Sequence, residues 1–210
     1  MTNASELIDA TPSAALLIES IRDIGYSIET AISDLIDNSI SANANNIYIN
    51  LNDDDVENIF LEIVDDGHGM NRNELIKAMT IGAKDPRIIR DKDDLGRFGL
   101  GLKTASFSQC RKLTVESNFN DEINSFTWDL DLVREKNNWV VIDNKKDNLA
   151  PGTKIIWEKI DRADFKLSKI NTNSILKNID NHLGLVFHRF LEGINLKSEK
   201  LKIFINGSEV

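Results

Sequence analysis

The chain has 210 residues, of which 41% are hydrophobic and 28% charged, an ordinary composition for one large globular domain, or for one domain and the start of another. A formal net charge of −9 excludes the diffuse positive field that drives non-specific binding to nucleic acids, but it leaves nucleotide binding open, because backbone N–H groups, a lysine and a metal ion neutralise phosphates locally. Short apolar runs, an N-terminus without a basic region before its apolar part, and a single cysteine, Cys110, exclude a membrane span, a signal peptide and an internal disulfide framework, so we expect a reducing compartment, the cytoplasm.

Local patterns predict helices and a hairpin in the first part of the chain. Residues 13–24 carry apolar side chains at helical spacing, and Ser13 is placed to cap the start. A second helix is predicted over residues 27–42. The strands 47–51 and 59–64, joined by a polar turn, predict a hairpin, and Asn71 with Glu74 forms a capping box for a short helix that ends at Met79.

The middle of the chain alternates irregular and periodic segments. Residues 80–98 are charged and irregular, which is typical of a solvated loop or of a mobile lid over a site. A helix is predicted from Gly99 to Cys110, and further strands over 113–118, 125–132, 139–143 and 153–157. This order of helices and mostly antiparallel strands predicts an α+β fold, a two-layer α/β sandwich.

The last predicted unit covers residues 161–210. An amphipathic helix over 174–191 precedes a strand, LKIFING, whose Asn206-Gly207 pair is a hairpin-turn signal. We therefore expect one domain over 1–160, and over 161–210 a linker helix and the start of a second, truncated domain.

The predicted helix 27–42 has two different faces. Its apolar residues recur at the spacing of a buried stripe: Ile28, Ala31, Ile32, Leu35, Ile36 and Ile40. Asp34, Asn38 and Ser41 lie along one edge of that stripe, and Asp37 lies further round, towards solvent. Asp and Asn are poor helix formers, so their stacking in mid-helix indicates a site, with a solvated polar face as the alternative.

Two glycine-rich stretches follow, Ile63-Val64-Asp65-Asp66-Gly67-His68-Gly69-Met70 and Gly96-Arg97-Phe98-Gly99-Leu100-Gly101-Leu102-Lys103. One such motif matches many unrelated loops, but both of them after the Asp34–Asn38 helix form a specific combination. Over roughly residues 12–157 the chain resembles the GHKL ATPases, which include DNA gyrase, heat-shock chaperone ATPases, histidine kinases and MutL, and within them the Microrchidia (MORC) proteins and their bacterial relatives. The resemblance implies the Bergerat fold, with helices on one face of a mixed, mostly antiparallel sheet. It makes 1–160 the ATP-binding domain and 161–210 the linker and start of a transducer-like domain.

The resemblance also assigns an adenine site. Asp65 matches the carboxylate that accepts a hydrogen bond from the adenine amino group. Gly67 and Gly69 would let the backbone turn beneath the base, and Met70 would pack on it. Thr153 matches a threonine that supports this carboxylate through its hydroxyl and water.

For the phosphates, the resemblance implies a magnesium ion and a helix N-terminus. Asn38 matches the Mg²⁺-binding asparagine, and the ion would keep several water ligands. In the lid, Lys84 would meet the γ-phosphate, together with Gly82 and Arg97. The remaining cofactor contacts are expected from the glycine-rich start of the helix: Gly99, Leu100, Gly101, Leu102 and Lys103.

The catalytic base departs from the family pattern. The family has a glutamate four residues before the metal-binding asparagine, whereas this chain has Asp34, which we take as the catalytic base. Glu29 lies about 180° around the helix from Asn38 and cannot replace it. Aspartate is one methylene shorter, and a displacement of about 1 Å can cost on the order of 100-fold in rate, so either Asp34 works or hydrolysis is slow. Asp66, where the family often has asparagine, is a milder departure.

We therefore expect Mg²⁺-dependent ATP binding and slow hydrolysis that drive lid closure and formation of a homodimer, as the ATPase module of a larger MORC-like protein. By analogy, the setting is DNA transactions or anti-phage and restriction defence, with DNA contacted by regions beyond this segment. The alternatives are a nucleotide-gated binding module without hydrolysis, a protein kinase of the histidine-kinase type, and a chaperone.

Overall fold

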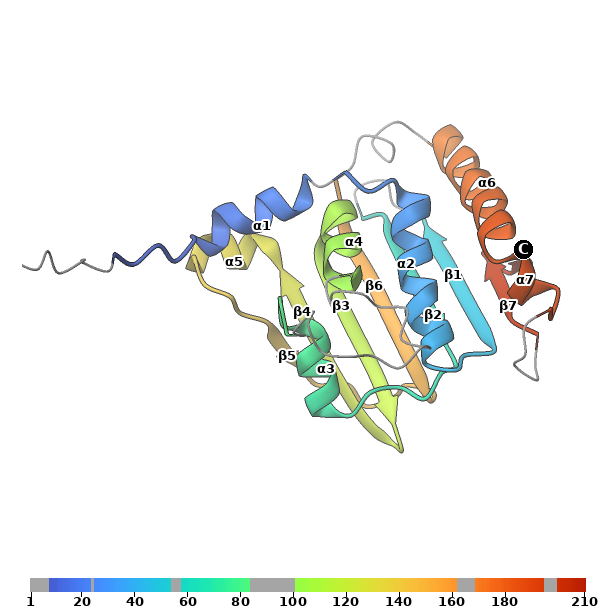
Figure 1. Ribbon diagram of the computed structural model, residues 1–210, viewed down its shortest axis with the longest axis horizontal. Coiled ribbons are helices and arrows are strands. Elements are labelled where there is room, and N and C mark those ends of the chain that lie inside the picture. Colours follow the sequence, from blue (N-terminus) through green and yellow to red (C-terminus); the bar gives the residue numbers. More distant parts are fainter. Residues whose placement is uncertain (1–7, 24, 54–57, 84–100, 162–168, 195–199) are drawn as a thin grey trace, which may run out of the picture.

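The computed structural model describes residues 8–23, 25–53, 58–83, 101–161, 169–194 and 200–210. Its centre is one eight-stranded sheet, in which β1 and β7 are parallel and the other neighbouring strands antiparallel (Figure 1). The α+β sandwich with a mixed, mostly antiparallel sheet is therefore confirmed. In spatial order the strands are β5 (Ile142–Asn144), β4 (Glu122–Asp129), β3 (Cys110–Phe119), β6 (Gly152–Ile160), β2 (Phe60–Asp65), β1 (Asn46–Asn52), β7 (Lys202–Ile205) and β8 (Ser208–Glu209).

Helices form the second layer, and α2 and α4 lie side by side across the middle of the sheet (Figure 1). Strand β1 shows why the layer is one-sided, because its buried Ile47 and Ile49 alternate with exposed Tyr48 and Asn50. None of the helices in the described ranges combines the length and apolar character needed to cross a bilayer. The helices are α1 (Ala14–Arg22), α2 (Ile28–Ser41), α3 (Arg72–Met79), α4 (Gly101–Gln109), α5 (Leu130–Lys136), α6 (Lys169–Val186) and α7 (His188–Leu191).

The predicted helix starts are confirmed at α2 and α3, but not in full at α1. Ser27 caps α2 by accepting the N–H of Thr30, and Asn71 and Glu74 form the complete capping box of α3. Ser13 precedes α1 without a side-chain cap, because its hydroxyl instead donates to the side-chain oxygen of Asn137 (2.7 Å), which directly follows α5.

The strand predicted over 125–132 is wrong at its end. The carboxylate of Asp129 accepts the N–H groups of Asp131 and Leu132, and so it caps α5 at the point where β4 stops. The strand predicted over 139–143 is shorter and shifted, since only Ile142–Asn144 pair with β4. The helix predicted from 174 starts earlier, at Lys169, and ends at Val186 before the short α7.

The C-terminal hairpin is confirmed, and it extends the sheet. Asn206 and Gly207 have φ angles of +45° and +82°, as a tight turn between β7 and β8 requires. Strand β7 lies beside β1, and α6 packs against α2. The domain boundary at residue 160 stays a prediction.

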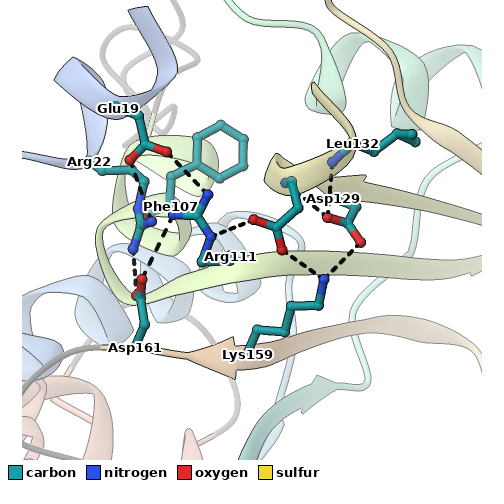
Figure 2. A network of polar contacts seen from close by, with 9 residues as sticks. Glu19, Arg22, Phe107, Arg111, Asp129, Leu132, Lys159 and Asp161 are labelled. Carbon is teal, nitrogen blue, oxygen red and sulfur yellow. Dashed lines mark hydrogen bonds and ion pairs between the residues drawn. The ribbon is translucent and has the colours of Figure 1, made fainter. Parts of the chain in front are cut away.

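A network of charges holds α1 and α5 to the end of the sheet near the last turn of α4 (Figure 2). The buried Arg22 donates to the backbone oxygen of Phe107 (3.0 Å) and to Asp161 (2.5 Å). Arg111 bridges Glu19 of α1 and Asp131 of α5. Because Phe107 belongs to the last turn of α4, the network fixes the helix whose first residue, Gly101, belongs to the expected phosphate site.

Candidate functional site

Helix α2 presents candidate side chains beside a buried apolar stripe, which is confirmed over its whole length. Asp34 is partly buried, and Asn38 and Ser41 are exposed. The hydroxyl of Ser41 donates to the backbone oxygen of Asp37, so it serves the helix itself. Ser39, which the sequence analysis missed, faces the interior and reaches Asp65; a serine inside an apolar stripe was the signal that could have identified it.

Asp65, at the end of β2, is a buried carboxylate with three hydrogen-bond donors, and 6% of its surface is exposed. Its Oδ1 accepts the backbone N–H groups of Gly67 (3.0 Å) and Thr153 (3.2 Å), and its Oδ2 accepts the hydroxyl of Ser39 (2.8 Å). Burial raises the pKa of Asp65 above its ordinary value, although these hydrogen bonds oppose the rise. The carboxylate is therefore held in one orientation, with a defined acceptor direction.

Three glycines around Asp65 are required by close backbone contacts. A Cβ on Gly152 (φ +125°) would lie 2.0 Å from the backbone oxygen of Asp65, and one on Gly69 (φ +69°) would lie 2.1 Å from that of Asn118. A Cβ on Gly67 would lie 2.8 Å from the Cβ of Ala42. A side chain at these positions would displace the loop that holds the carboxylate.

Ser117 of β3 joins the neighbouring segments. Its hydroxyl accepts the N–H of Met70 (2.8 Å) and lies 3.0 Å from the hydroxyl of Thr153. Thr153 thus reaches Asp65 through its backbone N–H, while its hydroxyl lies against Ser117; the side chain of Met70 packs against the core. Sequence analysis missed Ser117, although it lies two residues after buried Val115 and therefore on the same, helix-covered face of β3.

Asp66 accepts hydrogen bonds from the segment between α2 and β1. Its carboxylate accepts the backbone N–H groups of Asn45 (2.7 Å) and Asn46 (2.9 Å) and the side-chain amide of Asn46 (2.6 Å). Burial favours the neutral form, but these hydrogen bonds outweigh it and lower the pKa of Asp66. Asp66 therefore fixes the exit of α2 against the end of β2.

Asp34 lies beside the start of α4, since a Cβ on Gly101 would be 3.8 Å from its Oδ2. Burial raises the pKa of Asp34, and a hydrogen bond from the Tyr26 hydroxyl opposes that rise. Burial, and then the charge of Asp34, also raise the pKa of Asp37. A carboxylate whose ionisation is disfavoured by a neighbouring carboxylate forms an environment that a cation would stabilise.

The residues near Asp34 suit the expected magnesium ion only in part. In the part of the chain that the structure describes, no group of three or more His, Cys, Asp or Glu side chains could hold a metal ion. The exposed amide of Asn38, one turn after Asp34, still fits Mg²⁺, because this ion takes few protein ligands and retains water and phosphate oxygens as the others.

The remaining predicted contacts lie at or before α4. Gly101 starts the helix and Leu102 packs against the core. Lys103 is 2% exposed, and its Nζ donates to the backbone oxygen of Ala78 over 2.5 Å. Lys84, Gly99 and Leu100 lie outside the described residues, as does Arg97, so their roles stay predictions.

Comparison with known proteins agrees with this arrangement. Residues 26–163, more than half of the chain, match the family described as "Histidine kinase-, DNA gyrase B-, and HSP90-like ATPase". An 86-residue stretch is 38% identical to the ATPase morc-1 of Caenorhabditis elegans, and it covers 41% of this chain but 10% of that protein. The resemblance to GHKL and MORC-like ATPases is thus confirmed. Since the family match spans α2, the Asp65 loop and α4, the chain belongs to the histidine kinase-, DNA gyrase B- and HSP90-like ATPases and is an ATP-binding ATPase module.

Proposed function

We propose that this chain binds ATP together with Mg²⁺ and hydrolyses it, and that Asp65 recognises the adenine base. The observation that carries the proposal is the buried Asp65 carboxylate with its three donors, two of them backbone N–H groups. A carboxylate accepts a hydrogen bond from the exocyclic amine of adenine but not from the carbonyl of guanine, so the site prefers ATP to GTP.

The residues around Asp65 complete the adenine site. Gly67 and Gly69 let the backbone pass beneath the base, and Met70 packs on it. Thr153 orients Asp65 through its N–H, and Ser117 in turn holds Met70 and Thr153. This set of contacts supports binding of the base in one orientation.

At the phosphate end, Asn38 would hold Mg²⁺, and the ion would supply positive charge to offset that of the phosphates. Asp34 orients the attacking water and takes its proton. N–H groups at the start of α4, at Gly101 and Leu102, bind the phosphates together with Gly99, Leu100 and Lys84. The acidic environment of Asp34 and Asp37 supports a cation at this end.

The second candidate is a nucleotide-gated binding module that does not hydrolyse ATP. It is favoured by Asp34 itself, whose side chain is one methylene shorter than the family's glutamate and whose pKa is raised by burial, which disfavours the ionised form that a base needs. The two candidates share the adenine site and differ only in the fate of the γ-phosphate.

The wider function is proposed by analogy with the MORC relative, of which the matched segment is 10%. We propose that ATP binding closes the lid formed by residues 80–98 and dimerises the chain. In this proposal, residues 161–210 belong to a linker and a transducer-like unit. We also propose a cytoplasmic MORC-like protein that acts on DNA or in anti-phage defence.

The test is single-turnover hydrolysis of ATP with Mg²⁺ by the wild type, Asp34→Ala and Asp34→Glu, with binding followed by calorimetry. We expect hydrolysis by the wild type and Asp34→Glu, and ATP binding without hydrolysis by Asp34→Ala. Glu29→Gln, on the same helix, is the matched control and should hydrolyse at the wild-type rate. Chelation of Mg²⁺ should weaken binding of ATP and leave binding of adenosine unchanged.

Two results would count against hydrolysis through Asp34. Equal ATP binding with no hydrolysis by any variant, also when dimerisation is enforced, would favour the gated module. Equal hydrolysis by the wild type and Asp34→Ala would place the base elsewhere.

A further inference from the structure

The C-terminal end of α3 is held by two side chains from other elements. Its last carbonyl groups cannot all be bonded within the helix. The N–H of Thr80 lies 2.9 Å from the oxygen of Ile76 and 3.2 Å from that of Lys77. The next two oxygens accept side-chain donors: Ala78 O accepts Lys103 Nζ (2.5 Å) and Met79 O accepts Trp128 Nε1 (3.0 Å).

Both donors are buried and fixed by their surroundings. Lys103 is 2% exposed and Trp128 is 3% exposed. The Trp128 ring also lies edge to face with Phe107 of α4, with centroids 5.8 Å apart. A positive charge at a helix C-terminus interacts favourably with the helix dipole, so the ammonium group and the end of α3 stabilise each other.

We propose that Lys103 acts on the reaction as a positioning residue that clamps the end of α3 to the start of α4, and not as a ligand of the phosphates. Moving its ammonium away to a phosphate would leave the part-buried oxygen of Ala78 without this donor, which carries a desolvation cost.

The clamp links the two ends of the nucleotide site. This step of the inference rests on the proposed function. Helix α3 begins with the Asn71 capping box, directly after Met70 of the adenine loop. Its other end is tied by Lys103 to α4, whose first residues bind the phosphates in the proposed function. Lys103 thus sets the spacing between the base-binding loop and the phosphate-binding helix.

The experiment compares the wild type with Lys103→Met, which keeps the side-chain length and removes the charge. Calorimetry gives the affinities for adenosine, ADP and ATP, and hydrogen exchange of the nucleotide-free protein gives the protection of amides 76–82. A clamp should lower all three affinities by the same factor, within about threefold, and speed exchange at the end of α3 by about tenfold or more.

A phosphate ligand gives a different pattern. Lys103→Met would then weaken ATP at least about 30-fold more than adenosine, with unchanged exchange in α3, and that result would overturn the proposal. If Lys103→Met changed neither the exchange in α3 nor any of the three affinities, that result would also overturn the proposal. If the wild type binds no nucleotide, the proposed function fails, while the exchange measurement still decides on the clamp.

Two further variants control for general destabilisation. Trp128→Phe removes the second donor but keeps Lys103, so it should speed exchange at the end of α3 and keep the ratio of ATP to adenosine affinity. Lys112→Met removes a lysine that pairs with Glu158 on β6, and it should leave exchange in α3 unchanged.

Discussion

Asp65 and Asp34 are both aspartates whose pKa is raised by burial, but the protein holds them in different ways. Asp65 is held by two backbone N–H groups and Ser39, within a loop where a Cβ on Gly152 would lie 2.0 Å from a backbone oxygen. The Tyr26 hydroxyl opposes the rise in the pKa of Asp34, and a Cβ added to Gly101 would lie an ordinary 3.8 Å from the Oδ2 of Asp34.

This difference separates a region fixed by the backbone from one fixed by side chains. Backbone donors change only if the fold changes, whereas side-chain donors change with single substitutions. The base-recognition end should therefore tolerate little variation. The proposed catalytic end should accept a different residue more readily, and Asp34, where the family pattern has glutamate, lies at that end.

The largest contrast is expected between two glycine substitutions. Gly152→Ala places a Cβ 2.0 Å from the backbone oxygen of Asp65, at a φ of +125°, and should lower the free energy of unfolding by at least about 3 kcal/mol. Gly101→Ala, with room for its Cβ, should change it by less than about 1 kcal/mol. Urea denaturation measures both, and similar losses would remove the distinction between the two regions.

The next largest effect is expected for Asp65→Asn. The amide oxygen can still accept the N–H groups of Gly67 and Thr153, but its NH2 group would face the adenine amine as a second donor. ATP binding should weaken about 100-fold and binding of GTP much less. Calorimetry with both nucleotides tests this, and an unchanged preference for ATP would show that Asp65 does not recognise the base.

Ser39→Ala tests the side-chain donor that Asp65 has among the described residues. Loss of its hydroxyl removes a hydrogen bond to a buried carboxylate, so ATP should bind about tenfold more weakly. Ser41→Ala on the same helix is the control, since that hydroxyl is exposed and, among the described residues, donates to the backbone oxygen of Asp37 within α2. If both variants bind ATP equally well, backbone donors alone suffice to orient Asp65.

The smallest effect is a shift of the pH profile in Tyr26→Phe. The Tyr26 hydroxyl lowers the pKa of Asp34, so its removal should raise that pKa further above its ordinary value. A base must be ionised, so hydrolysis should fall off at a higher pH in the variant than in the wild type. Rates measured across the acidic range test this, with Tyr48→Phe, on the exposed face of β1, as the control.

Much of the fold could be predicted because its signals are local. The stripe of α2, its Ser27 cap and the capping box of α3 depend on residues within a few positions of one another. The end of β4 was missed because its alternation continues into α5, where Leu130 and Val133 are buried at helical spacing. Asp129 decides between the two structures by capping the helix, and its competition with strand pairing depends on the packed sheet.

For the site, the residue types could be predicted from local patterns in the chain: an aspartate after a strand, glycines where side chains do not fit, and an asparagine one turn after Asp34. Which atoms meet could not be predicted in this way. Ser39 and Thr153 reach Asp65 from 26 and 88 positions away, because the register of β2 with β6 and the packing of α2 bring them there. Lys103 likewise is expected at the phosphates from the sequence, and the position of α3 brings the oxygen of Ala78 within hydrogen-bond distance of its ammonium group. Periodicity specifies the face on which a side chain lies, and packing between distant elements specifies its partner.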